Sequence, residues 1–302
     1  MSRIALTGAS GLIGTALSSA LSARGDEVLH LVRRPARTAA EITWKPGSDL
    51  DPAALADVDA VVHLAGAGVG DKRWTPQYRK LIKSSRVEGT RTIAAALARL
   101  QRPVRLVSGS AVGFYGSDRA EEVLTEDSAA GSGFLAEVVQ AWEAQTERAT
   151  RAGHPVALAR TGIVLSPQGG AMAKVLPLSK LGLGGPLGSG EQYWPWITLP
   201  DEVAALMHLI DNPSITGPVN LVAPAPERQR ELMRLLGEAL GRPAVLPAPA
   251  FALRAALGEF AEDILGSQRV TPPVLLASGF TFTHPDPQSA MRWLADAARA
   301  TA

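Results

Sequence analysis

The chain has 302 residues, of which 46% are hydrophobic, and its 30 basic and 29 acidic side chains give a formal net charge of +1. This composition is ample for a folded core, and without a basic block it argues against nucleic-acid binding and against a polybasic membrane contact. The absence of cysteine excludes disulfides, a cysteine nucleophile and thiolate metal sites and favours the cytoplasm, and no apolar run is long enough to span a bilayer.

A glycine-rich turn separates the first predicted strand from the first predicted helix. Residues 4–6 are apolar, Gly8, Gly11 and Gly14 follow, and the helical pattern that begins at residue 12 stops before Gly25. A second apolar run at 28–32 completes a strand–turn–helix–strand unit. In this context such glycines let the backbone approach a pyrophosphate at the helix N-terminus, so we predict a dinucleotide-binding unit.

The end of the second predicted strand indicates which dinucleotide is bound. An acidic residue there would favour the ribose of NAD, but Asp26 and Glu27 stand at the start of the strand. Arg33 and Arg34 stand at its end, and their guanidinium groups suit the 2′-phosphate of NADP(H). We therefore predict NADP(H) as the cofactor. The alternative is that both arginines are solvated surface residues.

Apolar runs continue to alternate with helical patterns through the first half of the chain. Strands are predicted at 60–65, 104–108 and 155–159, with helices at 75–99 (one long or two short) and 134–151. Strands separated by helices predict an α/β fold, a doubly wound parallel sheet of the Rossmann type.

The pattern changes after residue 166 and predicts a smaller mixed α/β substrate lobe. A glycine-rich loop at 182–190 and an aromatic run at 193–196 precede a helix at 201–211, a strand at 219–222 and a helix at 227–240. We predict an NADP(H)-binding domain of 1–165 plus 201–222 and a substrate lobe of 166–200 plus 223–302. The loop, together with Trp194 and Trp196, is expected to form a wall of the substrate cleft between them.

Several motifs in this order resemble the short-chain dehydrogenase/reductase superfamily, in its extended, epimerase-like branch. They are the turn 7–14, His63-Leu-Ala-Gly66, Ser108-Gly-Ser110 leading to Tyr115-Gly116, Leu124-Thr-Glu-Asp127 and Arg160-Thr-Gly-Ile-Val164. Arg73-Trp74, Lys83-Ser-Ser-Arg86, Ala141-Trp-Glu143 and Gly266-Ser-Gln-Arg269 resemble its bacterial and organellar "epimerase family" subgroup, whose C-terminal domain has no assigned role.

The resemblance implies cofactor contacts beyond the three glycines of the turn. Within and around the turn these are Thr7, Ser10, Leu12 and Ile13. Near the adenosine ribose they are His63, Leu64, Ala65 and Gly66, and towards the nicotinamide they are Ser108, Arg160, Gly162 and Ile163.

The acid/base pair of that superfamily, a Tyr with a Lys four residues later, is missing. The residues four positions after Tyr78, Tyr115 and Tyr193 are Ile82, Arg119 and Ile197, and the expected segment reads Phe134-Leu-Ala-Glu-Val138. Either another acid has taken over proton transfer, or the protein binds NADP(H) and does little chemistry.

Three residues are candidates for the chemistry. Tyr115 would donate a proton, Ser110 would orient the reacting oxygen, and Arg86 would contact an anion or a developing oxyanion. Their structural alternatives are a loop-packing residue, a plain strand-end residue and a surface arginine. The five histidines are scattered without metal-ligand spacing, so no metal site is predicted.

The sequence thus predicts an NADP(H)-dependent oxidoreductase or epimerase-like protein that acts on a small carbonyl- or hydroxyl-bearing substrate. The alternative is a catalytically weak NADP(H)-binding regulatory or sensor protein. The identity of the substrate, the choice between reduction and epimerisation, and the oligomeric state stay open. We predict no nucleic-acid or membrane partner.

Overall fold

Seven parallel strands form the central sheet of the computed structural model, which describes residues 1–300. Their order is β11 (Gly217–Leu221), β7 (Val156–Thr161), β5 (Arg105–Ala111), β4 (Ala60–His63), β1 (Arg3–Thr7), β2 (Glu27–Val32) and β3 (Glu41–Thr43). The order reverses between β1 and β4. In open α/β sheets ligands bind beyond the carboxyl ends of the strands at such a point. The predicted fold class is confirmed.

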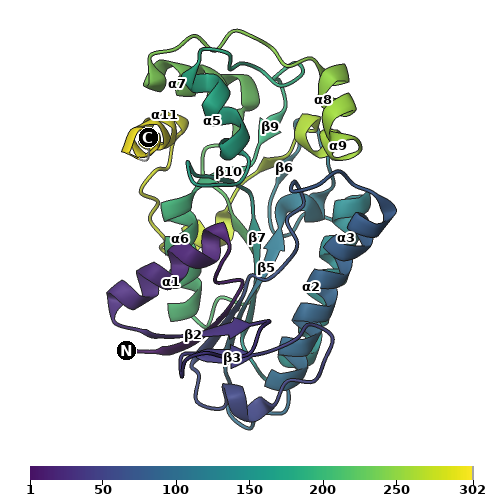
Figure 1. The fold of residues 1–302 in the computed structure, drawn as a ribbon, viewed down its shortest axis with the longest axis vertical. Helices are drawn as coiled ribbons and strands as arrows, with labels where there is room; N and C mark the ends of the chain where they lie inside the picture. Colours follow the sequence, from purple (N-terminus) through teal and green to yellow (C-terminus); the bar gives the residue numbers. More distant parts are fainter. Residues whose placement is uncertain (301–302) are drawn as a thin grey trace.

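Helices cover both faces of this sheet (Figure 1). One face carries α1 (Leu12–Arg24) and α6 (Leu199–Asp211), and the other carries α2 (Pro76–Leu97) and α3 (Phe134–Glu143). The segment predicted as one or two helices at 75–99 is the single helix α2. The helix predicted at 134–151 is interrupted by a 3₁₀ turn at Ala144–Thr146 before α4 (Glu147–Arg151), where the Thr146 hydroxyl donates to the Glu143 carbonyl at 2.7 Å.

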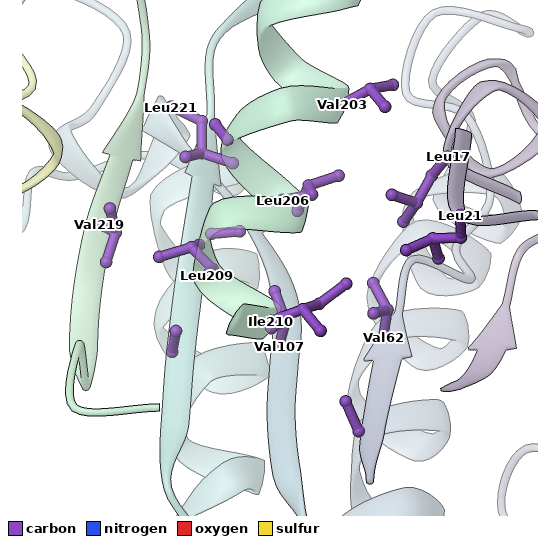
Figure 2. Close-up of a cluster of buried hydrophobic side chains, with 14 of the residues drawn as sticks. Leu17, Leu21, Val62, Val107, Val203, Leu206, Leu209, Ile210, Val219 and Leu221 are labelled. Carbon is purple, nitrogen blue, oxygen red and sulfur yellow. The ribbon is translucent and has the colours of Figure 1, made fainter. Parts of the chain in front are cut away.

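Aliphatic side chains fill the space between the sheet and the α1–α6 layer. Figure 2 shows Leu17 and Leu21 of α1 facing α6, whose Leu206 and Leu209 lie over the sheet. The strands supply Val62, Val107, Val219 and Leu221 to the same cluster. Strands buried on both faces explain why these runs are apolar throughout instead of alternating.

A second group of elements lies beyond the carboxyl ends of the strands, at the top of Figure 1. It contains β8 (Ile163–Leu165) parallel to β10 (Trp196–Thr198), and β9 (Tyr193–Trp194) antiparallel to β12 (Glu227–Arg228). Its helices are α5 (Met172–Lys180), α7 (Gln229–Leu240), α8 (Ala250–Leu257), α9 (Phe260–Leu265) and α11 (Pro287–Ala300). This group is the mixed lobe that the sequence predicted.

The lobe has a core of its own, and this core contains the two tryptophans expected at the substrate cleft. Trp194 and Trp196 are 4% and 1% exposed, and they pack with Leu165, Leu232 and Met291. The expectation that they form a wall of the cleft is therefore wrong: large apolar rings contribute more when buried in a core than when exposed.

Part of the C-terminal region also contacts the central domain. Leu275, in α10 (Pro273–Ala277), and Phe282 belong to the cluster of Figure 2, and β13 (Arg269–Val270) pairs with β6 (Val123–Leu124). The region after residue 223 thus packs on both parts, and the division into two domains stays a prediction. None of the helices in residues 1–300 has the length and apolar character needed to cross a membrane.

Candidate functional site

The turn between β1 and α1 has a backbone shape that only glycine permits at two positions. Gly8 adopts φ +73°, in the left-handed region. A Cβ on Gly14 would lie 2.1 Å from the Gly8 carbonyl oxygen, a contact that backbone atoms cannot relieve. The Gly11 amide donates to the same oxygen at 2.9 Å. The turn is therefore held tight against the start of α1.

The N-terminus of α1 has its amide groups available to an anion. Its N-cap is Gly11, which has no side chain to accept a hydrogen bond, and the first turn contains no acidic residue. Ser10 and Gly11 are exposed, while Leu12 and Ile13 are half-buried. Unpaired amides and the positive end of the helix dipole make this position suitable for a pyrophosphate.

Thr7 and His63, two of the predicted cofactor contacts, lie beneath this turn, and their side chains are fully buried. The Thr7 hydroxyl accepts hydrogen bonds from the Leu64 and Ala65 amides at 3.1 and 3.2 Å and lies 2.7 Å from His63 Nδ1. Burial lowers the pKa of His63 to about 4. Thr7 and His63 therefore hold the segment after β4 in place beside the turn.

Arg33 and Arg34 lie beyond the end of β2, and both are exposed. The Arg34 guanidinium donates to both carboxylate oxygens of Glu41, at 2.5 and 2.8 Å, and this lowers the pKa of Glu41 to about 2. Within residues 1–300 no hydrogen bond or ion pair involves the Arg33 side chain. The two arginines thus differ: Arg34 already has an anionic partner, and Arg33 has none.

A buried polar network connects the ends of β5, β7 and β11 to α3. Ser110 donates to Glu143 Oε1 at 2.5 Å, and Arg160 donates to both Glu143 oxygens at 2.9 and 3.0 Å. Arg160 Nη1 also donates to the Tyr115 hydroxyl at 3.1 Å, which in turn donates to Asn220 Oδ1 at 2.7 Å. The structure therefore brings Ser110, Tyr115 and Arg160 together, but around Glu143.

The burial of this network does not fit the roles predicted for its members. Tyr115 is 0% exposed, and burial raises the pKa of its hydroxyl. A hydroxyl enclosed in this way cannot reach a substrate in this conformation, so the structure does not support Tyr115 as the proton donor. Ser110 and Arg160 are also buried and committed to Glu143, and the Ser108 hydroxyl bonds the Gly109 carbonyl. These side chains lie beneath the site and position it.

Glu143 and Asn220 belong to this buried network, and the sequence analysis did not single them out. Glu143 belongs to a motif noted only as a family resemblance, and Asn220 is 105 positions from its partner Tyr115. Glu126 is a third member of the network, and its Oε1 accepts a hydrogen bond from the backbone amide of Asn220 at 2.9 Å. The available signal was polarity: Asn220 interrupts the apolar run of the strand predicted at 219–222, where burial demands a hydrogen-bond partner.

Arg86 of α2 lies at the end of β4 with an unpaired charge. Its Nη1 donates to the carbonyls of Ala67 and Ile82 at 2.8 and 3.1 Å, and its guanidinium lies 5.2 Å from the centre of the Trp142 ring. A Cβ on Gly66 would approach its Cζ to 3.2 Å. No ion pair in residues 1–300 involves Arg86, and burial lowers its pKa to about 10.

The end of β7 contacts Glu202 of α6, a buried carboxyl group that the sequence analysis did not single out. The Thr161 hydroxyl donates to Glu202 Oε1 at 2.8 Å, and Glu202 Oε2 is buried without a partner among the described residues. Complete burial raises the pKa of Glu202 to about 8. The neighbouring Gly162 has no room for a side chain, because a Cβ would lie 2.2 Å from the Pro195 oxygen, and Ile163 is half-buried beside it.

A cavity of about 470 Å³ lies between the start of α3 and the α8–α9 segment. Phe134 and Leu135, in the segment where the superfamily's Tyr is expected, line it from α3, and Asp263 lines it from α9. Burial, with repulsion from Glu262, raises the pKa of Asp263 to about 6. No cluster of potential metal ligands occurs in residues 1–300.

Comparison with known proteins identifies the family. The model of the NAD-dependent epimerase/dehydratase family matches residues 4–221. The chain belongs to this family. A domain of unknown function matches residues 248–294, which include α8, α9 and α10. The family-model match covers β1–β11 and hence the whole of the central sheet.

Relatives within the epimerase/dehydratase family match nearly the full chain. "Epimerase family protein Mb2239" of Mycobacterium bovis is 44% identical over 283 residues, 93% of each chain. "Epimerase family protein SDR39U1" of Bos taurus is 38% identical over 96% of this chain and 98% of its own. A crystal structure of human SDR39U1 with NADPH superposes with a TM-score of 0.88 at 33% identity, covering 97% of this chain and 99% of that chain.

Proposed function

We propose that this chain binds NADP(H) and acts as an oxidoreductase or epimerase-like enzyme on a small molecule with a carbonyl or hydroxyl group. The observation that carries the proposal is the β1–α1 turn, where Gly8 and Gly14 bring the backbone close to a helix N-terminus without a cap. The NADPH bound by human SDR39U1 and the unpaired Arg33 favour NADP(H) over NAD. The lack of cysteine supports a cytoplasmic location.

Each part of the site has a role in this proposal. The unpaired amides at the start of α1 would hold the pyrophosphate and Arg33 the 2′-phosphate. The segments 64–66 and 162–163 would contact the rest of the cofactor. The bound cofactor would supply or accept a hydride at the nicotinamide. Arg86 would contact an anion or oxyanion, and the Glu143–Arg160 pair would fix the strand ends around it.

The enzyme also needs a proton donor, because Tyr115 is enclosed. We propose Asp263 for this role, since its carboxyl group lines the cavity beside Leu135 and has a pKa raised to about 6. A carboxylic acid with such a pKa keeps its proton in slightly acidic solution, and in about a tenth of the molecules at pH 7, and can release it to a carbonyl oxygen. The C-terminal domain would then supply the acid that α3 lacks.

A second function, a regulatory protein whose partner affinity depends on bound NADP(H), is favoured by one observation. Neither a Tyr-x-x-x-Lys pair nor an accessible Tyr115 is present. In that case NADPH would bind tightly and no carbonyl compound would be turned over. The two functions share the cofactor site and differ only in chemistry.

One experiment separates these possibilities. NADPH and NADH are titrated into the purified protein while nicotinamide fluorescence is followed, and NADPH oxidation is then measured with a panel of aldehydes, ketones and quinones. Tight NADPH binding with turnover supports the enzyme, and binding without turnover supports the regulatory protein. Affinity for neither nucleotide would overturn both. Cofactor that copurifies with the protein would favour epimerisation over net reduction.

A further inference from the structure

Arg86 presents a half-buried cation for which the described residues provide no anion. Its Nη1 is held by two backbone carbonyls, and no carboxylate forms an ion pair with it within residues 1–300. Burying a charged group away from water is costly unless an opposite charge compensates it. A half-buried guanidinium whose charge no carboxylate compensates is therefore a candidate to bind an anionic ligand.

The location of Arg86 indicates where along the carboxyl edge of the sheet that ligand would lie. The guanidinium packs on Gly66, after β4, and over Trp142, whose ring would contact a Cβ on Gly109 of β5 at 3.2 Å. In strand order, β4 and β5 lie on the far side of β1 from β2, and Arg33 follows the end of β2. The helix N-terminus after β1 suits the pyrophosphate and Arg33 suits the 2′-phosphate, so Arg86 is left for a third anion.

The surroundings of Arg86 hold its guanidinium in a fixed orientation. The two carbonyl acceptors, the Gly66 backbone and the Trp142 ring contact it from different elements: the β4 loop, α2 and α3. Its Nε and Nη2 groups have no partner among the described residues. A planar fork with two unused donor groups matches a carboxylate or phosphate, which accepts two parallel hydrogen bonds.

We infer that the substrate bears a carboxylate or phosphate group, and that Arg86 binds this group beside the nicotinamide half of the cofactor site. This inference rests on the proposed function and narrows its substrate class to acidic carbonyl or hydroxyl compounds. Arg86 is then a specificity-determining residue: it holds a part of the substrate that does not react.

The test uses the purified protein saturated with NADPH, and small anions as probes. Acetate and inorganic phosphate are titrated while the ¹⁵Nε resonance of Arg86 is followed, with acetamide as the uncharged counterpart of acetate. We expect acetate to bind at least about tenfold more tightly than acetamide, as two charge-assisted hydrogen bonds should give. Equal responses to acetate and acetamide would overturn the inference.

Matched variants separate the substrate from the cofactor as the partner. Arg86→Met should abolish the anion response and leave NADPH affinity within about twofold, because only ligand contacts made by the guanidinium are lost. Arg86→Lys should restore part of the response, and Arg91→Met, an exposed arginine on the same helix, should change nothing. A loss of NADPH affinity in Arg86→Met instead would assign Arg86 to the cofactor and overturn the inference.

Failure of the proposed function gives a different result. If wild-type protein binds no NADPH, the anion titration is carried out on the protein alone, where the Arg86 resonance still reports binding. If Arg86→Met does not fold, the wild-type comparison of acetate with acetamide decides, since it needs no variant.

Discussion

Arg160 and Glu143 form an enclosed ion pair, with side chains that are 4% and 10% exposed and with two hydrogen bonds between them. We expect Glu143→Gln or Arg160→Met alone to lower the free energy of unfolding by about 3–5 kcal/mol, because each leaves a buried charge without its partner. The double variant Glu143→Leu/Arg160→Met should recover much of this loss. Urea unfolding followed by circular dichroism gives the free energy of unfolding of each variant. If the loss in the double variant equals the sum of the losses in the two single variants, the two side chains are not coupled.

The variant Tyr115→Phe tests whether Tyr115 stabilises the fold or donates a proton to the substrate. Tyr115→Phe removes the hydrogen bonds to Asn220 and from Arg160, and it should cost about 1–3 kcal/mol of unfolding free energy. Turnover of any substrate found and NADPH affinity should stay within a few-fold. Tyr193→Phe serves as a control, since residues 1–300 offer its hydroxyl no hydrogen bond. A large loss of kcat with unchanged stability would restore Tyr115 as the proton donor.

We expect Arg33 and Arg34 to contribute unequally to the preference for NADPH over NADH, because only Arg34 is paired with Glu41. Arg33→Ala should weaken NADPH binding about tenfold or more and leave NADH binding unchanged, because it removes a charge-assisted contact to the 2′-phosphate. Arg34→Ala should have a smaller effect, since Glu41 already compensates its charge. Glu41→Gln should strengthen NADPH binding by releasing Arg34. Fluorescence titrations with both nucleotides measure the ratios, and equal losses for NADPH and NADH would refute the assignment.

Glu202 predicts a pH-dependent stability of definite sign. Its pKa is about 8 in the folded protein and 4.5 without burial, so the folded state binds the proton more tightly. Its contribution to stability is therefore complete below pH 4.5 and is lost as the pH rises to 8. Glu202→Gln should remove this slope and stabilise the protein at pH 8 by a few kcal/mol. Urea unfolding at several pH values measures how the free energy of unfolding changes with pH, and Glu137→Gln, at an exposed position, is the control. If Glu202→Gln shows the same pH dependence as the wild type, the prediction is wrong.

Asp263 predicts the pH profile of an enzyme with a carboxylic acid donor. For carbonyl reduction the acid must be protonated, so kcat/KM should fall about tenfold per pH unit above the pKa of about 6. Asp263→Asn should lower kcat at least about a hundredfold with NADPH affinity unchanged. Glu262→Gln removes the neighbouring charge that helps to raise the pKa of Asp263, so it should move the fall in kcat/KM to lower pH and leave kcat below that fall within a few-fold. Full activity in Asp263→Asn would exclude this role.

Local patterns predicted the parts of the structure that depend on nearby residues. The β1–α1 turn, the strand at 60–63 and the helix at 76–97 follow from glycine spacing and apolar runs, which act over a few positions. The difference between Arg33 and Arg34 was not predictable, because it depends on Glu41 in the three-residue strand β3, which has no clear pattern.

Burial across long sequence separations explains the other differences. Tyr115 was expected at the cofactor because it follows a strand end, but Asn220, Arg160 and the chain around them enclose it. Trp194 resembles a cleft residue in sequence, yet its indole N–H donates to the Ile264 carbonyl, 70 positions away, inside the lobe. Such partners become adjacent only when the whole chain is folded.

The contact between Thr7 and His63 has a consequence for how the protein responds to acidification. An imidazole that stays neutral down to about pH 4 keeps its bond to the hydroxyl that organises the loop after β4. The loop after β4, beside the predicted nucleotide site, therefore keeps its shape over the pH range in which exposed histidines change their charge.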